Sequence, residues 1–181
     1  MARFPVWAIL VAVAGTAGLA VWAASLRDGL DLAASCGLAW ALMALAAIDV
    51  RRGILPDTLT LPLTAAGLAL AAIDGGPLAD RGLGAVAGYA AFASVAALYR
   101  LWRGRDGLGL GDAKLMAAAG AWVGWQSLPS VVLIAALAGL AGFGLRRMFN
   151  REAGLDRSIA FGPFLALAIW LVWLYGPLPI Q

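Results

Sequence analysis

Midway along the chain, the sequence reads Gly107-Leu-Gly-Leu-Gly-Asp112-Ala-Lys114-Leu-Met-Ala-Ala-Ala-Gly120-Ala-Trp122. This stretch places the carboxylate of Asp112 directly after a glycine-rich turn, at the start of an apolar helix. A carboxylate so close to hydrocarbon is costly unless it is protonated, paired or facing water. A second acid, Asp49, ends the apolar run of residues 41–48. The rest of the sequence indicates whether these two acids can meet.

The composition is that of an integral membrane protein. The chain has 181 residues, of which 63% are hydrophobic and 13% are charged, and its mean hydropathy is +0.89. A soluble domain is about half apolar and about a quarter charged. Eight Trp and three Tyr are typical of helices anchored at membrane interfaces. The basic residues interrupt apolar runs instead of forming one patch, so we expect membrane lipid as a partner and no nucleic acid.

The residue types present exclude several kinds of chemistry. The single cysteine, Cys36, permits no internal disulfide and no Cys-based zinc site. The chain has no His, which excludes His-dependent metal sites and Ser-His-Asp or Cys-His catalysis. We therefore expect no metal and no cofactor.

The apolar runs predict an all-α protein with about seven transmembrane helices in one membrane-embedded domain, residues 1–181. The expected helices cover about residues 6–26, 32–48, 57–73, 83–101, 112–125 and 130–145, and a last one follows Phe161-Gly162-Pro163 and ends near Tyr175. Residues 27–31, 74–77 and 150–158 are expected as polar connections. The first run could be a cleaved signal peptide, but its length suits a retained helix better. The other motifs lie within a core of residues 32–176.

The distribution of Lys and Arg predicts the orientation of the helices. With a cytoplasmic N-terminus, eleven basic residues lie on the cytoplasmic side: Arg3, Arg51, Arg52, Arg100, Arg103, Arg105, Lys114, Arg146, Arg147, Arg151 and Arg157. Only Arg27 and Arg81 lie on the other side. The excess places the N-terminus in the cytoplasm and the C-terminus outside. Asp49 and Asp112 are then both expected on the cytoplasmic side.

The helix expected at residues 112–125 is short for a membrane span. At 1.5 Å per residue it covers roughly 20 Å, against a hydrocarbon core of about 30 Å. If its far end reaches the opposite interface, Asp112 lies below the membrane surface and needs a cavity or a partner. Dense Gly and Ala, as in residues 84–88 and 135–139, predict close packing between the helices.

Two carboxylates in a site of low dielectric constant suit hydrolysis of a peptide bond. Both cannot easily ionise, so that one keeps a proton and the other can accept one from water. Such a pair can activate water against a carbonyl group while the protonated acid hydrogen-bonds the carbonyl oxygen. Taken singly, the residues have simpler interpretations. Asp112 can cap its helix, and Asp49 can be an acid at the membrane interface that pairs with Arg51 or Arg52.

Three motifs resemble those of the type IV prepilin peptidases, which are membrane aspartic peptidases of the Gly-x-Gly-Asp class. Ile48-Asp49, followed by Leu55-Pro56-Asp57-x-Leu59-Thr60-Leu61-Pro62-Leu63, is similar to their first motif. The stretch from Gly107 to Trp125 resembles the second, and Phe161-Gly162-Pro163-Phe164 a feature of a late helix. The resemblance covers about residues 48–173, in the expected order and spacing.

The resemblance implies an aspartic endopeptidase of the bacterial inner membrane in which Asp49 and Asp112 are catalytic. Such enzymes remove the basic leader from prepilins and pseudopilins of type IV pilus and type II secretion systems. They cut typically after a glycine and before a hydrophobic helix, at the cytoplasmic face. The active-site loop would contain Gly109 and Gly111, and Gly162 and Pro163 are candidate supporting residues.

Two further polar residues are candidates for supporting roles. Asp57 recurs in the first motif, but its position after Pro56 favours a helix cap over catalysis. Lys114 lies two residues after Asp112, and on a helix this spacing directs the two side chains largely away from each other. Two alternatives remain for Lys114. It could contact a lipid headgroup or a substrate carbonyl, or it could tune the acid pair. Trp122 and Trp125 are expected to pack or to lie at the interface.

One departure from longer family members limits the predicted activity. Those proteins carry paired Cys-x-x-Cys motifs between their first two helices, associated with N-methylation of the new pilin terminus. Here only residues 27–31 separate the corresponding helices, and Cys36 is alone. We therefore expect peptidase activity without the zinc-binding segment, and no methyltransferase activity.

Two other functions remain as alternatives. An aspartic lipoprotein signal peptidase would need substrates with a lipid-modified Cys at the new N-terminus. A small proton-coupled transporter or scaffold would use the two acids for protons and cleave no peptide, although the sequence has no inverted repeat to favour it.

Overall fold

The computed structural model describes residues 6–26, 29–104, 109–149 and 160–179. In these ranges the chain forms seven α-helices and one 3₁₀ helix, and no strand. The elements are α1 (Val6–Ala24), α2 (Gly29–Arg52), α3 (Asp57–Ile73), α4 (Leu78–Arg103), α5 (Leu110–Val123), η1 (Trp125–Ser127), α6 (Leu128–Phe149) and α7 (Gly162–Tyr175). The prediction of an all-helical protein is confirmed.

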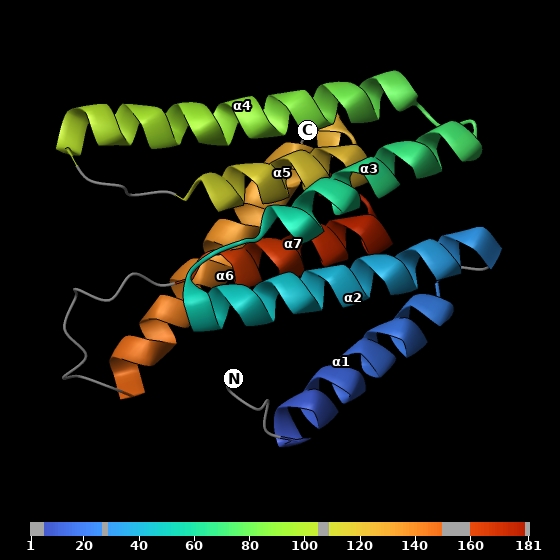
Figure 1. The fold of residues 1–181 in the computed structure, drawn as a ribbon, viewed down its shortest axis with the longest axis horizontal. Coiled ribbons are helices and arrows are strands. Elements are labelled where there is room, and N and C mark those ends of the chain that lie inside the picture. The colour runs from blue at the N-terminus through green and yellow to red at the C-terminus, as the bar shows by residue number, and fades with distance from the viewer. Residues whose placement is uncertain (1–5, 27–28, 105–108, 150–159, 180–181) are drawn as a thin grey trace.

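Successive helices run in opposite directions along the long axis of the molecule (Figure 1). The last residues of α2, α4 and α6 therefore lie at the same end of the bundle as the first residues of α3, α5 and α7. Asp49 is in the last turn of α2 and Asp112 in the first turn of α5. We call this end of the bundle the aspartate end.

Helix α5 lies at the centre of the bundle and packs against α3, α4, α6 and α7. Glycines let the neighbouring backbones approach it closely. A Cβ on Gly120 would lie 2.1 Å from the carbonyl group of Gly84 in α4, and one on Gly88 would lie 2.5 Å from the carbonyl oxygen of Met116. On the other side, a Cβ on Gly67 of α3 would lie 2.7 Å from the Trp122 ring. The close packing predicted for residues 84–88 is confirmed.

Indole groups connect four helices inside the bundle. Trp122 Nε1 of α5 donates a 2.8 Å hydrogen bond to the carbonyl oxygen of Leu63 in α3. The ring of Trp122 meets that of Trp173 in α7 edge-on, with centroids 5.2 Å apart. Trp173 Nε1 in turn donates to Ser35 Oγ of α2 at 2.8 Å. The packing role predicted for Trp122 is confirmed, whereas Trp125 is exposed.

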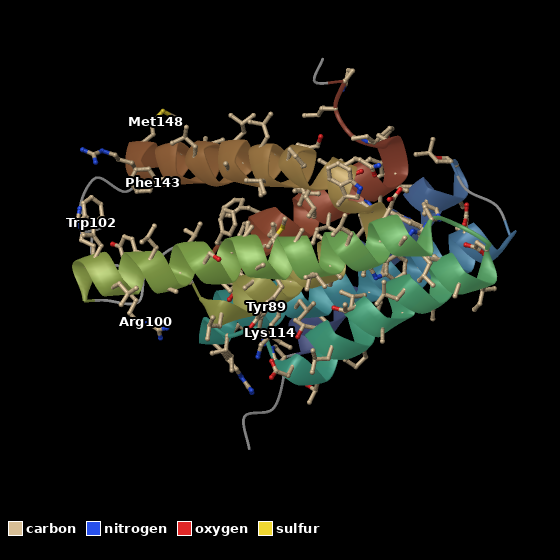
Figure 2. The ribbon with its side chains drawn as sticks, turned by 90° about the horizontal axis from the view of Figure 1, so that it is seen from above. Tyr89, Arg100, Trp102, Lys114, Phe143 and Met148 are labelled. Atoms are coloured by element: carbon tan, nitrogen blue, oxygen red, sulfur yellow. The ribbon has the colours of Figure 1, made fainter. Side chains whose placement is uncertain are left out.

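The outer faces of α4 and α6 are apolar. Leu98, Leu101 and Trp102 of α4 are exposed, as are Phe143 and Met148 of α6 (Figure 2). Within the described residues, three segments are long and apolar enough to cross a membrane: Asp31–Arg52, Leu78–Arg103 and Trp125–Leu145. Shorter apolar helices cover Gly15–Ala24, Asp57–Ile73 and Gly162–Tyr175. The chain is a helical membrane protein, and its seven spans and their orientation stay predictions.

Several helices extend beyond their predicted ends. Helix α2 continues past Asp49 to Arg52 and ends at Gly53, whose φ of 64° is left-handed. Helix α4 likewise runs to Arg103 and ends at Gly104, also with φ of 64°. Arginines near a helix C-terminus are favourable because they complement the helix dipole, and glycine adopts the left-handed C-cap without strain. Apolar length alone therefore placed these ends too early.

Helix α6 is longer than predicted at both ends, covering Leu128–Phe149 instead of residues 130–145. Proline is tolerated in a first helical turn, which has unpaired backbone N–H groups, so Pro129 does not delay its start. The predicted polar connection of residues 150–158, the first residues of the glycine-rich turn at 107–108, and Arg27 and Asp28 lie outside the described residues.

Candidate active site

Asp49 and Asp112 lie inside the bundle at the aspartate end. Their relative exposures are 6% and 9%, and no other charged residue in the described part of the chain is buried. The two carboxylates are close enough for their charges to interact. Burying a charge is costly unless it is paired, hydrogen-bonded or neutralised. Two acids buried at the same end of the bundle, within electrostatic range of each other, therefore form an unusual arrangement that packing alone does not explain.

The carboxylate of Asp49 is held by the start of α7. The backbone N–H of Gly162 donates a hydrogen bond of 2.9 Å to Asp49 Oδ2. The first N–H groups of a helix have no partner within the helix, so this bond satisfies one of them with a side chain. Pro163 is the next residue in the first turn of α7, where the missing N–H of proline costs no hydrogen bond within the helix. Both candidate residues of the Phe161-Gly162-Pro163 motif thus lie at the site.

Gly162 has no room for a side chain. A Cβ at this position would lie 2.5 Å from Asp49 Oδ2 and 2.9 Å from Asp49 Cγ. Any other residue would push the carboxylate away from the N–H group that binds it. In the sequence, only the family resemblance singled out Gly162, and no local pattern indicated its contact with Asp49.

The carboxylate of Asp112 is positioned by the glycine-rich turn. Asp112 is in the first turn of α5, where its N–H donates to the carbonyl oxygen of Gly109 at 3.0 Å. Its carboxylate in turn accepts a hydrogen bond from the backbone of Gly109. Asp112 therefore helps to cap its own helix and is also within electrostatic range of Asp49, and the two interpretations of this residue are compatible.

Gly111 allows the connection between α2 and α3 to contact α5. A Cβ on Gly111 would lie 2.9 Å from the Cβ of Leu55, which is itself buried. Leu55 belongs to the short segment between Asp49 and α3. Because Gly111 has no side chain, Leu55 can pack closely against it, and this contact holds the segment beside Asp112.

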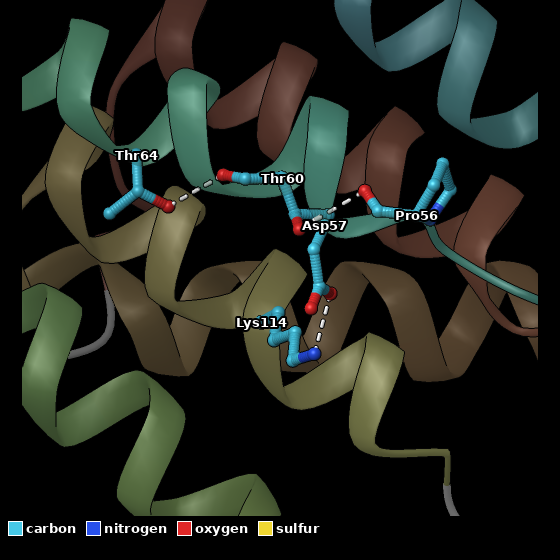
Figure 3. A network of polar contacts seen from close by, with 5 residues as sticks. All are labelled: Pro56, Asp57, Thr60, Thr64 and Lys114. Atoms are coloured by element: carbon cyan, nitrogen blue, oxygen red, sulfur yellow. Dashed lines mark hydrogen bonds and ion pairs between the residues drawn. The ribbon is translucent and has the colours of Figure 1, made fainter.

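Asp57 and Lys114 form an ion pair between α3 and α5. The distance from Lys114 Nζ to Asp57 Oδ1 is 2.5 Å, and the side chains are 30% and 54% exposed, respectively (Figure 3). The prediction that Asp57 caps α3 was wrong: Pro56 occupies the N-cap without a side-chain bond, and Asp57 is the first helical residue. A partner 57 positions away attracts this carboxylate, and no local sequence pattern indicated it.

The site contains oxygen donors but no evident metal cage. No group of three or more His, Cys, Asp or Glu in the described ranges is arranged to hold a metal ion. What the structure brings together is two buried carboxylates and a backbone N–H donor. This set can bind and polarise a water molecule and hydrogen-bond a carbonyl group.

Fold and site together define the class: a helical membrane protein in which two helices bring a pair of aspartates into the interior. Residues 36–144 match the profile of the type IV leader peptidase family. The chain belongs to this family.

Curated relatives agree with this assignment. The chain is 42% identical over 176 residues to a prepilin leader peptidase/N-methyltransferase of Aeromonas salmonicida, covering 97% of this chain and 59% of the relative. It is 43% identical over 166 residues to one of Burkholderia pseudomallei, covering 91% and 52%. It thus spans between half and three-fifths of these relatives' length, and the methyltransferase activity is named for the longer proteins. No solved structure matches the chain significantly.

Proposed function

We propose that the chain is an aspartic endopeptidase that removes the leader peptide from type IV prepilins and pseudopilins. The observation that carries the proposal is the pair of buried carboxylates, Asp49 and Asp112, which interact although they come from different helices. Membership of the type IV leader peptidase family supports the same substrate class. No cofactor is needed, because the carboxylates themselves can move the protons.

The proposal gives the two acids different roles. Each carboxylate accepts a backbone hydrogen bond at the N-terminus of a helix, Asp49 from Gly162 and Asp112 from Gly109. Two negative charges near each other are unfavourable, so one acid keeps a proton, and we assign that proton to Asp112. Asp49 then acts as the general base toward water, and Asp112 donates a hydrogen bond to the substrate's carbonyl oxygen.

The reaction follows from these roles. Water loses a proton to Asp49 as its oxygen attacks the scissile carbonyl carbon, and the carbonyl oxygen takes the proton of Asp112. When the tetrahedral intermediate collapses, the carbon–nitrogen bond breaks and the leaving amine takes the proton from Asp49. Asp112 recovers its proton from the hydroxyl group of the intermediate, so that both acids return to their first states.

The distribution of Lys and Arg supports a cytoplasmic site. The excess of basic residues on the side of the aspartate end favours the cytoplasmic face of the inner membrane for this end. The apolar helix of the substrate would enter from the bilayer while its basic leader stays in the cytoplasm. The absence of methyltransferase activity stays a prediction from the sequence.

The test is cleavage of a prepilin by the purified protein in lipid. Asp49→Asn and Asp112→Asn should each abolish cleavage while leaving the protein folded in the membrane. Asp74→Asn, which changes an exposed acid at the opposite end of the bundle, should cleave like the wild type. Retained cleavage by Asp112→Asn would contradict the mechanism.

A substrate panel separates the peptidase from the alternatives named above. A substrate with Gly before the cut should be processed, and one with a lipid-modified Cys should not. Processing of only the lipidated substrate would instead support a lipoprotein signal peptidase. Proton-coupled flux without cleavage would support a transporter.

A further inference from the structure

The ion pair between Asp57 and Lys114 lies beside the site without being part of the acid pair. It joins the first turn of α3 to α5, and Lys114 is only two residues after Asp112 (Figure 3). A partly exposed ion pair contributes little to the free energy of unfolding. Lys114 is also close to the positive end of the α5 dipole, where a cation brings no advantage to its own helix. The pair therefore calls for a role other than stability.

A second contact joins the region at the start of α3 to α5, at the residue before Asp112. Leu55 packs against Gly111, the residue before Asp112, whereas Asp57 pairs with Lys114, two residues after it. The chain at the start of α3, from Leu55 to Asp57, is thus attached to α5 both before and after the second acid. Because this part of the chain follows the end of α2, which carries Asp49, the two attachments link the position of Asp112 to that of Asp49.

Two threonine hydroxyl groups hydrogen-bond within α3, the first of them in the turn that carries Asp57. Thr60 Oγ1 donates to the carbonyl oxygen of Pro56 at 3.3 Å, and Thr64 Oγ1 to that of Thr60 at 2.9 Å (Figure 3). Thr60 is fully buried, so this turn is packed in place.

We propose that Asp57 and Lys114 are positioning residues for the peptidase reaction, acting as a clamp that holds the first turn of α5 so that Asp112 faces Asp49. The inference rests on the proposed function. Neither residue touches the reacting atoms. Catalysis is sensitive to displacements of about 1 Å in a catalytic group, so loosening this clamp should slow the chemical step more than it weakens substrate binding.

The test compares Asp57→Asn, Lys114→Met, the double variant, and the exchanged pair Asp57→Lys with Lys114→Asp. Each single variant should lower kcat by about tenfold or more with little change in KM and in the thermal unfolding temperature. The double variant should be no slower than the slower single variant, because both remove one interaction. The exchanged pair should recover part of the lost kcat. Asp80→Asn, in the first turn of α4 at the opposite end, is the matched control.

Three kinetic results would overturn the clamp. One is wild-type kcat in both single variants. Another is a rise in KM at unchanged kcat, which would indicate substrate binding. The third is a loss of activity that follows a fall in unfolding temperature, which would indicate a role in stability alone.

A measurement without substrate separates this inference from the proposed function. Hydrogen exchange of the backbone amides of residues 112–115 should be faster in Lys114→Met than in the wild type or in Asp80→Asn. If the wild type cleaves no prepilin but exchange still depends on Lys114, the proposed function fails and the clamp stands as a structural finding. If the wild type cleaves and exchange is unchanged in Lys114→Met, the clamp fails and the proposed function stands.

Discussion

The backbone N–H of Gly162 donates a 2.9 Å hydrogen bond to the Asp49 carboxylate across 113 positions of the chain. This bond connects the start of α7 to the last turn of α2, at the end of the bundle that also holds Asp112. It explains why a glycine stands at position 162, since a Cβ would lie 2.5 Å from the carboxylate oxygen. It also fixes one of the two acids before any substrate arrives.

Gly162→Ala should therefore impair catalysis while leaving the protein in the membrane. The added Cβ displaces the Asp49 carboxylate, and we expect kcat for prepilin cleavage to fall by about tenfold or more. Gly37→Ala is a suitable control, because it lies on α2 with Asp49 and a Cβ there would meet nothing within 4 Å. Equal kcat values for the two variants would contradict the positioning of Asp49 by Gly162.

Trp173→Phe should destabilise the protein more than Trp170→Phe. Both residues are buried on α7, but Trp173 Nε1 donates to Ser35 at 2.8 Å whereas Trp170 Nε1 has no hydrogen-bond partner among the described residues. Losing the first bond should cost about 1 kcal/mol beyond the loss of packing that the two substitutions share. Thermal or denaturant unfolding in the same detergent measures the difference. The reverse order of stabilities would show that the Trp173–Ser35 bond contributes nothing net.

Gly120→Ala should separate α4 from α5. The new Cβ would lie 2.1 Å from the backbone of Gly84, and the rigid main chain must move to admit it. Overpacking of this kind costs about 1–3 kcal/mol or more. Gly82→Ala on α4, where a Cβ meets nothing within 4 Å, should be neutral or slightly stabilising. Comparable unfolding temperatures for the two variants would argue against the close backbone contact.

The predicted orientation can be checked with single cysteines in a Cys36→Ala background. Asp74→Cys, in the turn between α3 and α4, should react with a membrane-impermeant maleimide in intact cells. Arg52→Cys, at the aspartate end, should react only after the inner membrane is permeabilised. Both positions are exposed, so a difference in labelling reports the side of the membrane. Labelling of the Arg52→Cys protein in intact cells would invert the topology and place the aspartate end outside.

Much of the fold follows from local patterns. Apolar runs separated by Gly, Pro and charged residues predicted the seven helices, because burial of apolar side chains and helix-breaking residues act over short stretches of chain. Helix α3 ends at Ile73 as predicted, and it begins at Asp57, one residue earlier than a cap at Asp57 would imply. The ends of α2 and α4 differ from the prediction, since arginines and a terminal glycine prolong each helix by a few residues.

The relationships inside the site depend on how distant segments pack. The sequence singled out Asp49 and Asp112 because a carboxylate beside hydrocarbon is unusual, and the charge count predicted that they lie on one side. Their electrostatic contact, the bond from Gly162 and the pairing of Asp57 with Lys114 join helices that are far apart in the chain. No local propensity specifies such a contact. Each arises because α5 is enclosed by its neighbours, and glycines at the contacts let those neighbours come close enough to position the two acids.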